Sequence, residues 1–84
     1  MIAWTKNRRA AVAWLLKKSK PMTIAEAEQA VRDGELGIKL TSVNRTFVDG
    51  VKPGVFGKAG SAYYPLINPE TGNPVALRLV EVNT

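Results

Sequence analysis

The chain has 84 residues, with twelve lysines and arginines against seven acidic residues, a formal net charge of +5 and a sequence pI near 9.9. It contains no cysteine and no histidine, which excludes disulfides and thiolate metal sites and removes the commonest general base. The length predicts a single domain over residues 1–84 with one modest core. The charge favours an anionic partner, with nucleic acid first.

The positive charge is concentrated toward the N-terminus. No acidic residue precedes Glu26, whereas the basic residues of this stretch are Lys6, Arg8, Arg9, Lys17, Lys18 and Lys20. No apolar run approaches the roughly 20 residues that span a membrane, and no secretory pattern opens the chain. We therefore expect a cytoplasmic protein with no membrane partner.

Residues 5–19 predict a first helix, capped by Thr5 or Asn7, that buries one side and presents basic side chains on the other. The expected inward positions are Ala11, Val12, Leu15 and Leu16, and Trp14 is expected at the edge as partial core. The expected outward basic positions are Lys6, Arg9, Lys17 and Lys20. The helix should stop before Pro21, because the residue before a proline is pushed out of the helical region.

A second helix is predicted from a capping box, with Thr23 at the cap and Glu26 three residues later. It should run to about residue 33 and end at Gly34. In the segment that follows, Leu36 and Ile38 are expected to point inward.

Residues 41–50 predict a short third helix, with Thr41 as N-cap and Gly50 as its stop. Val43 and Phe47 lie four residues apart and should form its buried edge. The outward side should carry hydrogen-bonding side chains, namely Ser42, Arg45 and Asp49, flanked by Asn44 and Val48.

Two segments after the helices favour β-strands: residues 61–68, which are rich in aromatics, and residues 75–82, which are rich in valine and leucine. Residues 69–74 between them form a turn signal. Earlier in the chain, Val55 and Phe56 should either form a short strand, or Phe56 should fill the core beneath the third helix.

Three short patterns resemble those of bacterial and phage winged helix-turn-helix proteins: T-x-x-E at 23–26, L-G-I at 36–38 and S-V-x-R at 42–45. The resemblance covers residues 8–66 and implies an α+β fold, with three helices followed by a β-hairpin wing. Gly37 matches the glycine that this family uses between its second and third helices. Segment 32–40 is longer than the family's usual tight turn. The wing tip falls either at residues 58–61, which carry a lysine, or at residues 69–74, which allow longer strands.

The resemblance implies that the third helix reads duplex DNA in the major groove. Arg45 would pair with guanine O6/N7 and Asn44 with adenine N6/N7, although Arg45 could instead pair with Asp49. Thr41 and Ser42 would contact phosphates, act as helix caps, or do both. The further expected phosphate contacts are Lys39, Arg9, Lys17, Lys18, Lys20 and, on the wing, Lys58.

The predicted function is therefore DNA binding, as a transcriptional regulator or a plasmid or phage control protein. A homodimer on a two-fold site is attractive, with the apolar segments 1–4 and 75–82 as contacts. Two alternatives remain open at this stage. One is a winged-helix protein that binds a host protein, such as a phage-encoded inhibitor, through Trp4, Trp14 and an exposed tyrosine. The other is RNA binding through the basic helix and the aromatic strand. We expect no catalytic activity, no cofactor and no metal.

Overall fold

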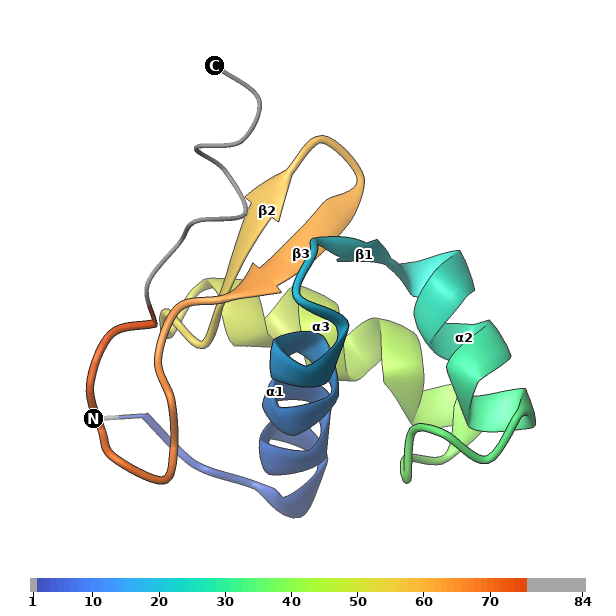
Figure 1. Cartoon of the computed structure of the whole chain (residues 1–84), viewed down its shortest axis with the longest axis horizontal. Helices are drawn as coiled ribbons and strands as arrows, with labels where there is room; N and C mark the ends of the chain where they lie inside the picture. Colours follow the sequence, from blue (N-terminus) through green and yellow to red (C-terminus); the bar gives the residue numbers. More distant parts are fainter. Residues whose placement is uncertain (1, 76–84) are drawn as a thin grey trace.

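The computed structural model of the protein describes residues 2–75, which form three α-helices, a 3₁₀ turn and three short strands (Figure 1). In chain order they are α1 (Lys6–Lys18), β1 (Met22–Thr23), α2 (Ile24–Arg32), the 3₁₀ turn η1 (Leu40–Ser42), α3 (Val43–Val51), β2 (Phe56–Ala59) and β3 (Ala62–Pro65). The strands form one antiparallel sheet in the order β1-β3-β2. The predicted fold class is confirmed: the protein is α+β, with three helices followed by an antiparallel hairpin that pairs with a short strand, consistent with winged helix-turn-helix topology.

Helix α1 begins at the first of its two predicted caps. The Thr5 hydroxyl accepts a hydrogen bond from the backbone N–H of Arg8, at 3.2 Å. The expected burial of the helix is wrong at two positions, because Leu16 is 37% exposed and Trp14 only 4%. Trp14 is fully inside because its indole N–H has a partner there, the carboxylate of Glu35, at 2.9 Å. A tryptophan whose polar atom is satisfied buries more apolar surface than the leucine would.

The capping box that opens α2 is present. Thr23 Oγ1 accepts from the backbone N–H of Glu26 at 3.1 Å, and Glu26 Oε1 accepts from the backbone N–H of Thr23 at 2.9 Å. The latter bond lowers the pKa of the Glu26 carboxyl. At the other end, Gly34 has a φ of 76°. The N–H of Glu35 bonds to the carbonyl of Ala30 at 2.8 Å, the arrangement of a Schellman motif.

The segment between α2 and η1 is long but well anchored. Leu36 and Ile38 are 3% and 6% exposed, which confirms the two predicted inward positions. Glu35 accepts from Trp14 and forms an ion pair with Lys18, so that the segment is also tied to α1. Gly37, in contrast, has no positive φ, and a Cβ there would meet nothing within 4 Å. The glycine whose conformation matters in this segment is therefore Gly34.

Both predicted boundaries of α3 are wrong. Thr41 lies inside η1, and the N-cap position belongs to Ser42, whose side chain makes no capping hydrogen bond. The helix also continues through Gly50 to Val51. Gly50 is buried, and a Cβ at this position would lie 2.5 Å from Cδ2 of Phe56. This glycine therefore allows β2 to approach α3 closely and does not end the helix.

The core is centred on aromatic side chains that the hairpin contributes beneath α3. The ring centroid of Phe47 lies 4.9 Å from that of Phe56 and 5.4 Å from that of Tyr63. Phe56 thus fills both roles proposed for it, since it opens β2 and fills the space beneath α3. The buried core draws on all three helices and all three strands.

The hairpin turns at residues 60–61, between β2 and β3 (Figure 1). Gly60 has a φ of 62°, the positive value that the first central position of a type II′ turn requires. Of the two predicted wing tips, the one at 58–61 is therefore the tip of the β2–β3 hairpin. The predicted strand 61–68 is shorter, at Ala62–Pro65, and residues 69–74 form a second turn closed by an Ile67–Pro74 bridge. Apart from Val75, the predicted strand 75–82 lies outside the described residues. No helix in the described part of the chain is long and apolar enough to cross a membrane.

Candidate nucleic-acid interface

Helix α3 has one face in the core and one face in solvent. Its buried residues are Val43, Thr46, Phe47 and Gly50, and its exposed residues include Asn44, Arg45, Val48 and Asp49. Thr46 is tolerated inside because its hydroxyl donates to the carbonyl of Ser42 at 2.7 Å. The buried face therefore fixes the helix, while the exposed face brings the two predicted base-reading residues, Asn44 and Arg45, together.

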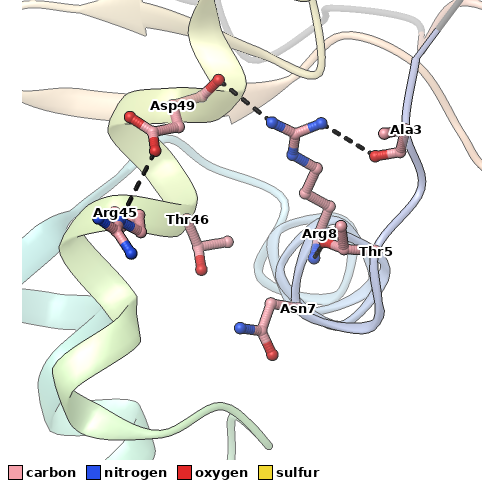
Figure 2. A pocket seen from close by; sticks show the side chains of 7 residues that line it. All are labelled: Ala3, Thr5, Asn7, Arg8, Arg45, Thr46 and Asp49. Carbon is pink, nitrogen blue, oxygen red and sulfur yellow. Dashed lines mark hydrogen bonds and ion pairs between the residues drawn. The ribbon is translucent and has the colours of Figure 1, made fainter.

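Arg45 is the most prominent cation of this face. Its side chain is 86% exposed, and its Nε lies 3.9 Å from Oδ2 of Asp49, one turn later (Figure 2). An exposed pair at i,i+4 contributes only about 0.3–0.5 kcal/mol. Both alternatives raised for Arg45 are therefore compatible with the structure, because a contact this weak orients the guanidinium without committing it.

The residues before α3 lie on the same segment as this face. Lys39 and Thr41 are exposed and Ser42 is half-buried. Because Thr41 is not the cap, its hydroxyl is not required by the helix. Sequence reasoning missed one basic residue at the opposite end: Lys52, directly after α3, is exposed. Lys52 follows Arg45 by seven residues, or about two helical turns, and so lies on the same side of the helix. The sequence would have indicated this if Gly50 had not been interpreted as the end of the helix.

Arg8 is a structural cation that sequence analysis counted only as part of the basic N-terminus. Its Nη1 donates to the carbonyl of Ala3 at 2.9 Å, and its Nη2 donates to the carbonyl of Asp49 at 3.3 Å (Figure 2). It thereby joins the N-terminal segment to the last turn of α3, where a cation also complements the helix dipole. These residues, with Thr5, Asn7, Arg45 and Thr46, line an open hollow beside the exposed face of α3.

The predicted basic stripe of α1 points in a different direction. Arg9 and Lys17 are exposed on the side of α1 opposite Ala11 and Leu15, the side that packs into the core. Because α3 packs against that inner side, behind α1 in Figure 1, the stripe faces away from α3. Lys18, also expected to contact phosphate, is instead paired with Glu35.

The remaining two predicted phosphate contacts lie near the N-terminus of α2 and the hairpin. Lys20 is exposed, and its charge helps to lower the pKa of the Glu26 carboxyl after the hydrogen bonds from Thr23. Lys58 is exposed two residues before the hairpin turn, with its Nζ 5.6 Å from the centroid of the Tyr63 ring. A second shallow hollow there is lined by Thr23, Ile24, Ala25, Lys58, Ser61 and Tyr63.

The aromatic residues considered as partner anchors are largely used by the fold itself. Trp14 and Tyr63 are each 4% exposed. Trp4, like Ile2, packs half-buried against the core. The Tyr64 ring lies directly over Gly57, in the space that a Cβ there would occupy.

Comparison of the chain with protein-family models, curated proteins and solved structures found no match. The functional interpretation therefore depends on the geometry of α3 and on the distribution of charge around it.

Proposed function

We propose that this protein binds duplex DNA by placing the exposed face of α3 in the major groove, as a transcriptional regulator or a plasmid or phage control protein. The observation that carries the proposal is the two-sided character of α3. Its inner face is buried in the core, and its outer face presents both Asn44 and Arg45 to solvent. A single helix fits the major groove, which is about 12 Å wide.

The chemistry of these two side chains matches base edges. The Arg45 guanidinium can donate two parallel hydrogen bonds to guanine O6 and N7, and the Asn44 amide can pair with adenine N6 and N7. Arg45 loses little free energy when it gives up its contact with Asp49 for one with a base, because this ion pair is long and exposed.

Basic residues at both ends of the η1–α3 segment supply the contacts to phosphate. Lys39 lies before η1 and Lys52 after α3, and both are exposed. Phosphate contacts set affinity and register without selecting a sequence. Arg9 and Lys17 face away from α3, so their part in this proposal is limited to long-range attraction of DNA by the net charge of +5.

The test is selection from a randomised duplex pool, followed by titration of the enriched duplex and a scrambled duplex at two salt concentrations. We expect a motif that binds about 10³-fold more tightly than the scramble, and a palindromic motif would indicate a dimer. Arg45→Ala should weaken binding to the motif about 5- to 150-fold, the value of one bidentate base contact, and relax the preference at one guanine.

Arg9→Ala is the matched control, because it removes the same group from the α1 surface that faces away from α3. It should leave the selected motif unchanged. If nothing is enriched, or if Arg45→Ala and Arg9→Ala have equal effects on sequence preference, the proposal is wrong. The search should then turn to a protein partner, with RNA as a third class to be tested with single-stranded and looped probes.

A further inference from the structure

Exposed apolar side chains gather on the segment that contains α3. Among the described residues, the large apolar side chains with substantial exposure are Leu16 at 37%, Leu40 at 38%, Val48 at 47% and Val51 at 36%. All except Leu16 belong to η1 or α3. Isolated exposed apolar residues are ordinary, but a group on one short helix whose other exposed residues are polar needs a reason.

Val48 differs from its two neighbours in where it lies on the helix. At 100° per residue, Val51 falls next to the buried face, whereas Val48 falls well inside the exposed face, between the directions of Asn44 and Arg45. It lies four residues after Asn44 and three after Arg45, so it is a direct surface neighbour of both. Val48 adds little to the packing of the core, and valine is a weaker helix former than alanine. The fold therefore gains little from a valine here.

We infer that Val48 is a specificity residue that contacts the C5-methyl group of a thymine, an inference that rests on the proposed DNA binding. The thymine methyl is the apolar group that the major groove presents, and apolar side chains read it by contact. The polar neighbours of Val48 are suited to the hydrogen-bonding edges of adenine and guanine. On the exposed face of α3, the apolar Val48 thus lies between the polar Asn44 and Arg45. This arrangement suits a DNA sequence in which a thymine lies beside a contacted purine.

The test uses the motif obtained by selection, with each thymine replaced in turn by uracil, which removes the methyl group and leaves the hydrogen-bonding edge unchanged. For the unmodified protein we expect one position at which uracil weakens binding about fourfold, the value of burying one methyl-sized group. Val48→Ala should bind the thymine and uracil probes equally at that position. Because Val48 lies on the exposed face and alanine is the better helix former, the variant should unfold at the same temperature as the unmodified protein or slightly above it.

Leu16→Ala is the matched control, since it removes a comparably exposed apolar side chain from α1. It should retain the full preference for thymine over uracil. The inference is overturned, and the proposed DNA binding stands, if a motif is found but no uracil replacement weakens binding, or if Val48→Ala still prefers thymine. If no motif is enriched, both fail, and Val48 becomes the first residue to test as an apolar contact to a protein partner.

Discussion

Gly50→Ala provides a direct test of how α3 is held against the hairpin. In the interior of an ordinary helix this change stabilises a protein by about 1 kcal/mol, because alanine is the better helix former. Here the added Cβ would lie 2.5 Å and 2.6 Å from two ring carbons of Phe56. The Phe56 ring is fully buried, and its centroid lies 4.9 Å from the centroid of the Phe47 ring, so it cannot move aside freely.

Overpacking a core costs about 1–3 kcal/mol, and two contacts this short favour the upper half of that range. After the gain in helix propensity is subtracted, Gly50→Ala should lower the free energy of unfolding by about 1–2 kcal/mol. For a domain of this size, the Tm should fall by roughly 4–16 °C. Thermal unfolding followed by circular dichroism measures this directly.

Gly37→Ala is the matched control for Gly50→Ala, because Gly37 has no positive φ and an open surrounding. It should be neutral or stabilise by up to about 1 kcal/mol. Combining Gly50→Ala with Phe56→Leu should cost less than the sum of the single changes, by at least about 0.5 kcal/mol, since the smaller side chain makes room for the methyl. A Tm for Gly50→Ala at or above that of the unmodified protein would refute the argument.

Three further predictions concern the ends of the helices. Thr23→Ala removes the capping box and should lower the free energy of unfolding by about 1 kcal/mol in urea titration; an unchanged midpoint would contradict this. The ion pair with Lys18, and then the indole hydrogen bond, hold the pKa of Glu35 below its usual range. The ionised Glu35 carboxylate therefore contributes its full stabilisation above the ordinary carboxyl pKa. This stabilisation is lost as the pH falls through the lowered pKa that Glu35 has in the folded protein. Glu35→Gln should make the unfolding free energy fall less steeply as the pH is lowered. The fall should not disappear, because the pKa of Glu26 is also lowered. Parallel pH profiles for the two proteins would refute the assignment. Arg8→Met keeps an unbranched stem in place of the aliphatic part of arginine but removes both hydrogen bonds that join the N-terminal segment to α3. Thermal unfolding should show a loss of about 1 kcal/mol, and an unchanged Tm would count against this role.

The features that could be predicted from the sequence are those set by neighbouring residues. The Thr23–Glu26 capping box, the cap at Thr5 and the inward positions Leu36 and Ile38 all depend on residue types a few positions apart. Such local patterns have few alternative outcomes, because each satisfies backbone groups or buries side chains within one turn. They gave the order of the three helices, whereas the fold class with its β-hairpin was implied by the family resemblance, and β1 was not predicted.

The errors arose where the partner of a residue lies outside its own helix. A glycine late in a helical pattern is typical of a stop, and only the position of Phe56 shows that Gly50 permits a close approach. Leu16 and Trp14 fit the inward stripe about equally well. Glu35, 21 residues after Trp14, decides between them by satisfying the indole.

The same limit applies to the candidate interface. Sequence reasoning placed Asn44 and Arg45 together on the third helix, because helical spacing alone determines which residues share a face. It could not distinguish free cations from structural ones. Arg8 bonds to a carbonyl 41 residues away, and Lys18 is paired with Glu35. The basic surface available to a ligand is therefore smaller than the count of lysines and arginines suggests.

The division of α3 into two faces makes stability and binding separable by experiment. Asn44, Arg45 and Val48 lie on its solvent face, so their removal should leave the Tm nearly unchanged, whereas changes at Thr46 or Gly50 alter packing. A variant of the solvent face that loses binding at constant Tm has lost a contact to the ligand. A variant of the inner face that loses both has lost the orientation of the helix. Measuring both quantities on the same variants therefore tests whether the buried face of α3 serves to present the exposed one.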